Sequence, residues 1–238
     1  MKKHRKIAII LLNLGGPDSL ASVKSFLFNL FYDRAIINLP NPLRFIIAKL
    51  ISTLRNKKAQ DIYSHMGGKS PILAETQGQA VALSKMVSEV AEFDHRVFVS
   101  MRYWKPFSTD IILSVLQYDP QQIILVPLYP QFSTTTTASS IDDFNEVLKF
   151  YKYKGAVKAL GCYFLDQGFI DSHVKLLKNS LDKMKDDNFI VLFSAHGLPV
   201  SVIKNGDPYQ WQIQQTTDKV ALAAGLNNNQ YMITYQSR

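Results

Sequence analysis

Residues 189–209, FIVLFSAHGLPVSVIKNGDPY, decide the fold class of this chain. They begin with the apolar, partly β-branched run 189–193, which predicts a short strand buried on both faces, as in a parallel sheet. His196 follows at once, before a glycine and a proline that end the strand. Ligands of open α/β sheets bind just beyond the carboxyl ends of strands, so His196 stands at a candidate site. A partly buried structural histidine is the alternative.

Strands and helices alternate on both sides of this stretch. A helix is predicted to follow the histidine. Asp207 suits its N-cap, Pro208 suits its first helical position, and Gln210 completes a capping box. Other short apolar runs predict strands at 7–12, 96–101, 123–128, 157–160 and 231–235. Stretches with helix signals separate them: 19–32, 43–63, 71–91, 108–117, 141–149, 166–184 and 208–224. The alternation predicts an α/β fold with mostly parallel strands and helices on both faces.

The least structured connection runs from residue 129 to residue 140 and ends in a polar loop, 133–140. We therefore predict two domains, an N-terminal α/β domain at 1–130 and a second α/β domain at 131–238. A chain of 238 residues is long enough for one or two domains of ordinary size.

Composition narrows the class of protein. Hydrophobic residues make up 47% and charged residues 19%, which is typical of a core-forming globular protein. The one cysteine excludes an intramolecular disulfide and suits a reducing, cytoplasmic compartment. The basic, apolar N-terminus resembles a signal peptide, but without a small-residue cleavage site it reads better as a first strand. The net charge of +8 favours acidic partners, although no nucleic-acid-binding motif is present.

Two glycine-containing segments resemble nucleotide-binding motifs but do not match the full motif in either case. The segment 12–17, LNLGGP, lacks the spacing of a dinucleotide fingerprint. The segment 67–70, GGKS, lacks the first glycine of a P-loop, because position 63 is Tyr63. A nucleotide-binding oxidoreductase is therefore disfavoured.

The predicted strand ends share an apolar and aromatic character, with one cation and one imidazole. These residues are Leu14, Arg102, Tyr103, Tyr129, Phe132 and His196. Each of these residues, taken alone, more often packs against other side chains than binds a ligand. Together at strand ends they predict a pocket for a flat apolar ligand held by few polar groups.

Six segments, in order and in spacing, resemble the signatures of the ferrochelatase family. They are LLNLGGP, GGKSPI, MRYWKP, PLYPQFSTTTTASS, FSAHGLP and KNGDPY. The resemblance implies a chelatase-like fold of two Rossmann-like parallel-sheet halves, the second incomplete. It also implies the insertion of ferrous iron into protoporphyrin IX to form protohaem, the last step of haem biosynthesis.

The resemblance also implies roles for individual residues. His196 matches the active-site histidine, as a metal ligand or as the acceptor of a pyrrole proton, and both roles stay open. The residues that match the porphyrin cleft are Leu14, Tyr63, Arg102, Tyr103 and Tyr129. Arg55 and Ser70 match groups that meet the porphyrin propionates. Aromatic faces suit a macrocycle, and a guanidinium suits a carboxylate.

The chain departs from the family pattern in two places. Thr134 stands where some members carry a cluster-ligating cysteine, so we expect no iron–sulfur cluster and only Fe²⁺ as substrate. The carboxylate-bearing segment that would face the histidine and the closing helices have no match, which predicts a truncated product. A truncated, inactive porphyrin-binding remnant is thus the alternative function. Asp142, Asp143 and Glu146 are interpreted as an exposed helix face.

Residues 25–54 alternate apolar clusters, FLFNLF and LRFIIAKLI, with basic residues within and after them. Lys49, Arg55, Lys57 and Lys58 supply the positive charge. An apolar face with basic flanks can lie on a lipid surface, so a peripheral contact with the inner face of the membrane is one hypothesis. Helices that pack on the sheet, or that form the lip of the cleft, are the more common use of such a pattern. The oligomeric state stays open.

Overall fold

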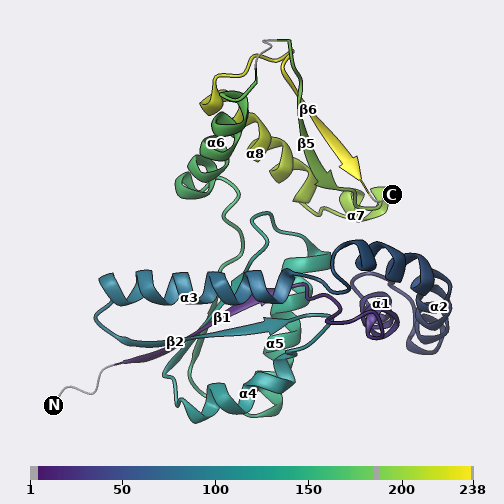
Figure 1. Cartoon of the computed structure of the whole chain (residues 1–238). Coiled ribbons are helices and arrows are strands. Elements are labelled where there is room, and N and C mark those ends of the chain that lie inside the picture. The colour runs from purple at the N-terminus through teal and green to yellow at the C-terminus, as the bar shows by residue number, and fades with distance from the viewer. Residues whose placement is uncertain (1–4, 185–187, 237–238) are drawn as a thin grey trace. The chain divides into compact units, whose positions relative to one another are not determined.

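The computed structural model describes residues 5–184 and 188–236. The chain divides into two compact units, each described by itself below. Unit 1 comprises the residues up to 128 together with 134–160, and unit 2 comprises 129–133 and the residues from 161 onward. Figure 1 shows both units and labels helices and strands in each.

Unit 1 is built on a sheet of four parallel strands in the order β2-β1-β3-β4. The strands are β1 (Lys6–Asn13), β2 (Asp94–Met101), β3 (Gln122–Pro127) and β4 (Ala156–Ala159). In the register of the central strand, Ile9 lies between Val97 of β2 and Ile124 of β3. The predicted α/β fold class with parallel strands is confirmed.

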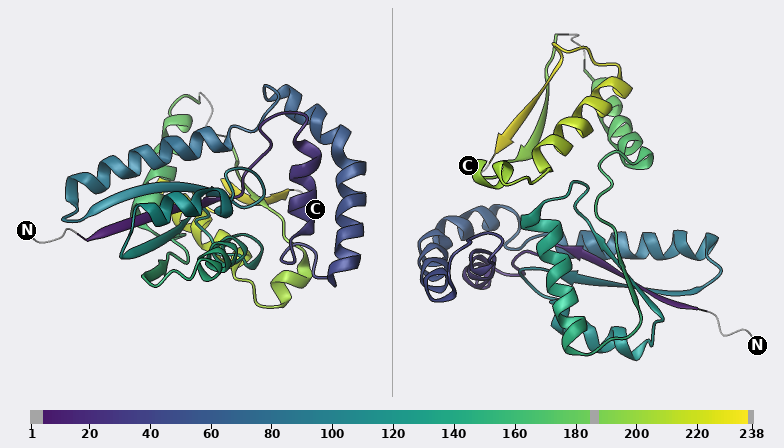
Figure 2. Two further views of the ribbon diagram at one scale, coloured as in Figure 1. Left: turned by 90° about the horizontal axis from the view of Figure 1, so that it is seen from below. Right: turned by 180° about the vertical axis from the view of Figure 1, so that it is seen from behind.

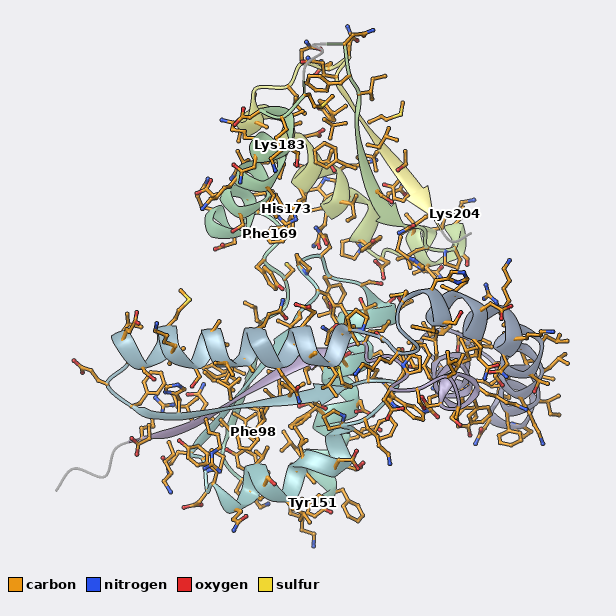
Figure 3. All side chains as sticks on the ribbon, viewed as in Figure 1. Phe98, Tyr151, Phe169, His173, Lys183 and Lys204 are labelled. Carbon is orange, nitrogen blue, oxygen red and sulfur yellow. The ribbon has the colours of Figure 1, made fainter. Side chains whose placement is uncertain are left out.

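Helices cover both faces of this sheet. On one face of β1, Ala8, Ile10 and Leu12 pack with α4 (Ser108–Gln117) and α5 (Ser139–Phe150). Phe98 of β2 joins this layer, next to α4 in Figure 3. On the other face, Ile7, Ile9 and Leu11 pack with α3 (Ile72–Val90). Figure 2 shows α3 opposite α4 and α5, so β1 has the two-sided burial of a central parallel strand.

Two helices, α1 (Val23–Tyr32) and α2 (Asn41–His65), lie side by side beyond the carboxyl ends of the unit 1 strands (Figures 1 and 2). Val23, Phe26 and Leu27 of α1 are buried against Tyr103, which follows β2. This contact fixes the helix pair to the sheet end where the sequence predicts a site. None of the described helices combines the length and the hydrophobicity required to cross a bilayer.

Residues 134–160 belong to unit 1, whereas the sequence assigned them to the second domain. The physical reason is the sheet, because β4 is hydrogen-bonded to β3 and Phe144 of α5 is buried in the unit 1 core. The predicted polar loop at 133–140 is largely a π-helix, η1 (Thr134–Ala138), which leads directly into α5. Thr135 and Thr137 are buried there, so the loop is a packed element.

Unit 2 holds a parallel two-stranded sheet of β5 (Val191–His196) and β6 (Tyr231–Gln236). Three helices accompany it: α6 (Gln167–Leu181), α7 (Val200–Lys204) and α8 (Tyr209–Ala224). Contacts join α8 to α6 and to β6. The prediction that the strand after residue 189 is buried on both faces is wrong, because Leu192 is 59% exposed while Ala195 on the opposite face is buried.

The helix α8 starts one residue later in the GDPY segment than the sequence predicts. The helix starts at Tyr209, so Pro208 is the N-cap and not the first helical residue. Asp207 keeps a capping role, since its Oδ1 accepts a hydrogen bond from the Tyr209 N–H at 3.0 Å. At the other end, Gly225 takes the left-handed conformation typical of a helix terminus, with φ of 83°.

Candidate functional site

The predicted site residues fall into two groups. Unit 1 carries Leu14, Arg55, Tyr63, Ser70, Arg102 and Tyr103. Unit 2 carries Tyr129 and His196. Each group is therefore built up from its own unit.

The loop after β1 brings three of the unit 1 residues together. The N–H of Tyr103 donates to the carbonyl of Leu14 at 2.9 Å, which extends the β1–β2 pairing past the strand ends. The N–H of Ser70 donates to the carbonyl of Pro17 at 2.8 Å. A Cβ at Gly16 would lie 2.5 Å from the Ser70 side chain, so only glycine allows this approach. Leu14, Ser70 and Tyr103 thus lie around one loop.

Tyr63 of α2 completes this grouping from the helix pair. It packs with Leu14 against the cluster that contains Tyr103, and burial raises the pKa of its phenol. Arg55, two turns earlier on α2, is exposed and lies over the ring of Phe31 at 5.8 Å from the ring centroid. The contact of Arg55 with a porphyrin propionate stays a prediction. We call Leu14, Tyr63, Ser70 and Tyr103 the strand-end cluster.

Each of the three guanidinium nitrogens of Arg102 has a protein partner. Its Nη2 donates to Asp33 Oδ2 at 2.8 Å and its Nη1 to Asp143 Oδ1 at 3.2 Å, while Nε donates to Ser139 Oγ at 2.8 Å. Three elements meet at this side chain, because Asp33 caps the end of α1 and the other two residues belong to α5. The guanidinium of Arg102 therefore has a structural role that the sequence did not indicate.

Tyr103 shares this network through its hydroxyl, which donates to Asp33 Oδ2 at 2.8 Å. The residue is 1% exposed, and burial, followed by the Asp33 charge, raises the pKa of its phenol far above the usual range. Tyr103 stays a neutral hydrogen-bond donor at any physiological pH. A polar contact of its hydroxyl with a ligand would have to replace the one with Asp33.

Asp33 is the residue of this network that sequence reasoning missed. Burial raises the pKa of its carboxyl, but hydrogen bonds from Ser139 and Tyr103 and the charge of Arg102 outweigh burial and lower it overall. Asp143, predicted to lie on an exposed helix face, instead accepts from Arg102 and from Ser108 Oγ, the latter at 2.7 Å. The sequence offered one signal for this role of Asp33, namely that it is an acid directly after the apolar helix 23–32.

In unit 2, His196 is the last residue of β5, and its side chain is exposed. It shares one face of the sheet with Leu192 and Met232, both exposed. The following residue fixes the strand end, because the Gly197 N–H donates to the Gln236 carbonyl at 2.7 Å. Burial raises the pKa of the nearby Tyr209 phenol, whose oxygen also meets the backbone of His196.

Tyr129 belongs to a short segment that is tied to α8. The Phe132 N–H donates to Gln212 Oε1 at 2.6 Å, and Ser133 Oγ donates to Asp207 Oδ2 at 3.0 Å. Asp207 and Gln212 are buried, so these contacts are shielded from water. Through Asp207 and Tyr209, the GDPY segment connects the segment that carries Tyr129 with the strand end that carries His196.

Two further motifs can be placed. The GGKS segment lies between α2 and α3 and follows no strand, as the failed P-loop pattern predicted. Among residues 5–184 and 188–236, no three His, Cys, Asp or Glu side chains lie close enough together to hold a metal ion. The assignment of His196 as a metal ligand stays a prediction.

Comparison with known proteins agrees with the family resemblance of the six signature segments. The family model described as ferrochelatase matches residues 6–238. The ferrochelatase of Rickettsia bellii (strain OSU 85-389) is 51% identical over 98% of this chain, and that of Rickettsia felis is 51% identical over 100%. A Wolbachia ferrochelatase is 49% identical over 98% of the chain. The matched region covers 64%, 67% and 74% of these relatives, respectively. The chain belongs to the ferrochelatase family.

Proposed function

We propose that this chain binds protoporphyrin IX and ferrous iron and supports the insertion of the iron to form protohaem. The observation that carries the proposal is the strand-end cluster in a chain of the ferrochelatase family. Leu14, Ser70 and Tyr103 lie around one glycine loop, and Tyr63 packs in the same apolar cluster as Leu14. An aliphatic and an aromatic side chain suit the face of a flat macrocycle. Arg55 and the Ser70 hydroxyl suit the two propionates.

The chemistry requires that protoporphyrin IX lose two pyrrole protons as Fe²⁺ enters, and no electron is transferred. In our proposal His196 accepts one of these protons or binds the incoming iron, and either role needs the neutral imidazole. Its exposed position at the end of β5 leaves the ring accessible. Iron is the substrate. One cysteine cannot supply the four ligands of an iron–sulfur cluster, so we propose that this chain holds none.

The surface of α2 supports a further proposal about location. Four of its exposed apolar side chains, Leu43, Ile46, Leu50 and Leu54, follow the three- and four-residue spacing of one helix face. Lys49, Lys57 and Lys58 on the same helix add positive charge. We propose that the protein works in the cytoplasm and that this face contacts the inner surface of the membrane, where an apolar substrate is available.

A two-step assay of the purified chain tests the function. Protoporphyrin fluorescence first measures porphyrin binding, and absorbance under reducing, oxygen-free conditions then follows Fe²⁺ or Zn²⁺ insertion. Binding together with insertion supports the proposed function. Binding without insertion would favour a porphyrin-binding role alone, and the lack of both would contradict the proposal.

A further inference from the structure

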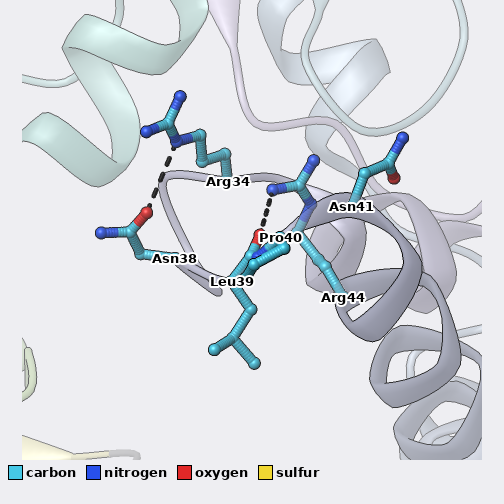
Figure 4. Close-up of a pocket in the computed structure, with 6 residues that line it drawn as sticks. All are labelled: Arg34, Asn38, Leu39, Pro40, Asn41 and Arg44. Carbon is cyan, nitrogen blue, oxygen red and sulfur yellow. Dashed lines mark hydrogen bonds between the residues drawn. The ribbon is translucent and has the colours of Figure 1, made fainter.

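A separate cavity of about 450 Å³ lies in unit 1 where α1 is followed by α2. Six residues line it: Arg34, Asn38, Leu39, Pro40, Asn41 and Arg44. Figure 4 shows the loop side chains Arg34 and Asn38 on one side and Arg44, from the first turn of α2, on the other. None of the six belongs to the strand-end cluster, so this cavity lies outside the proposed porphyrin contacts. We call it the α1–α2 pocket.

The side-chain acceptor atoms of the α1–α2 pocket already have hydrogen-bond partners. Arg34 Nε donates to Asn38 Oδ1 at 3.4 Å, and Arg44 Nη1 donates to the Leu39 carbonyl at 2.8 Å. Asn41 Oδ1 accepts from the Tyr32 hydroxyl. What remains for a ligand is therefore the donors: the amide NH₂ groups of two asparagines and the other guanidinium N–H groups.

Positive charge in the pocket is not neutralised by the protein. Within the described ranges 5–184 and 188–236, the recorded ion pairs all use Arg102, so no carboxylate pairs with Arg34 or Arg44. Asp33, the acid next to Arg34, directs Oδ2 to Arg102 and Oδ1 to the Ala35 N–H. The α2 N-terminus, without a side-chain cap or an acid in its first turn, adds a partial positive charge.

Arg44 is held in place, and one of its N–H donors still lacks a partner. Its guanidinium lies over the Tyr32 ring, 5.3 Å from the centroid, and this contact restrains the side chain. Its Nε is shielded from solvent and has no hydrogen-bond partner among the described residues. A buried charged donor without an acceptor is costly, and a ligand oxygen would remove that cost.

We propose that the α1–α2 pocket binds a phosphate group through Arg34 and Arg44, with the Asn38 and Asn41 amides as further donors. Two guanidinium groups that pair with no carboxylate of the described residues match the oxygens of a phosphate. The volume is within the range of small-molecule sites, about 300–1,000 Å³, and so accommodates a phosphate ester as well as free phosphate. The phosphate comes either from solution or from the headgroup of an anionic lipid. This proposal does not depend on iron insertion.

Titration calorimetry of the full chain at constant ionic strength tests the site. One arm uses inorganic phosphate, and the other uses a short-chain phosphatidic acid below its micelle concentration. We expect saturable binding in at least one arm. The arm with the higher affinity identifies the source of the phosphate group, and the absence of binding in both would overturn the proposal.

Matched variants separate the pocket from general charge attraction. Arg34→Gln removes an exposed guanidinium and should weaken binding about tenfold, as expected for the loss of a charge-assisted contact. Lys24→Gln removes one exposed positive charge from α1 outside the lining and should change affinity less than about twofold. Equal losses in the two variants would show nonspecific attraction and would overturn the site. Chemical shifts of the Asn38 side-chain amide give a second readout, which must move with phosphate in the unmodified chain.

Discussion

Arg102 and Asp33 join the end of β2 to the end of α1 through a single ion pair, with Nη2 and Oδ2 2.8 Å apart. The Asp33 carboxylate also accepts from Tyr103 and Ser139, so one acid connects α1, the β2 loop and α5. The α1–α2 pair carries Tyr63 and Arg55, and therefore the position of these residues against the sheet depends on Asp33.

The first prediction concerns this acid. Asp33→Asn should lower the free energy of unfolding by about 3 kcal/mol, because it leaves the Arg102 charge partly unpaired in a largely buried site. Asp142→Asn is the matched control, since Asp142 is an exposed acid on α5 and should change stability by less than about 0.5 kcal/mol. Urea unfolding followed by circular dichroism measures both. Equal stability of the two variants would contradict the structural role of the network.

A second prediction follows from the lowered pKa of Asp33. A carboxyl whose pKa is lower in the folded than in the unfolded chain stabilises the fold fully above the unfolded value, about 3.9. This stabilisation is lost as the pH falls through the folded pKa. The stability difference between the unmodified chain and Asp33→Asn should thus shrink as the pH falls below about 4. Unfolding curves at a series of pH values test this, and a constant difference would contradict it.

The parallel α/β fold could be predicted because its signals are local. In β1, a continuous apolar run gives a central strand, and the residues that follow it in the sequence also follow it in space. The Asp33–Arg102 pair could not be predicted in this way, because the two residues are far apart in the sequence and carry no motif that links them. The sequence placed Arg102 in the predicted pocket and gave Asp33 no role.

The site, too, could be predicted only where its residues belong to recognisable sequence segments. Leu14, Ser70 and Tyr103 were grouped by family resemblance, and the backbone contacts of one loop explain the grouping. The assignment of 134–160 to the second domain failed for another reason. A polar run of threonines reads as a linker, yet the strand that follows α5 pairs with β3, and pairing between strands is not visible in composition.

The third prediction tests the loop of the strand-end cluster. Gly16→Ala should weaken porphyrin binding about tenfold, because the new Cβ would displace Ser70, 2.5 Å away. Gly78→Ala in α3 is the matched control, since a Cβ there meets nothing within 4 Å and should stabilise the helix by about 0.5–1 kcal/mol. Fluorescence titration with protoporphyrin IX measures affinity. Unchanged affinity in Gly16→Ala would separate Ser70 from the porphyrin site.

The fourth prediction addresses the membrane face of α2. The chain should float with vesicles that contain phosphatidylglycerol at low salt and much less at high salt, because screening weakens the lysine contribution. Ile46→Ser removes an apolar side chain that is 61% exposed and should reduce flotation. Met86→Ser on α3, at 66% exposure, is the matched control and should not. Absence of flotation at low salt would exclude this face as a membrane contact.

The last prediction concerns His196. If insertion is observed with the chain, His196→Ala should reduce its rate by at least about 100-fold, as expected for the loss of a group that takes a proton or binds the metal. Porphyrin affinity should stay within about tenfold, because apolar contact supplies most of it. The side chain is exposed at the end of β5, so its removal should leave stability nearly unchanged.

His173→Ala provides the matched control for this variant. His173 also lies exposed in unit 2, next to Phe169 on α6 in Figure 3, with a ring-to-ring distance of 4.4 Å. It has no place among the residues that match the family signatures, so its loss should leave insertion within about twofold of the unmodified chain. A rate that falls equally in both variants would point to a general effect on unit 2. A rate that is normal in His196→Ala would remove His196 from the chemistry and require another proton acceptor.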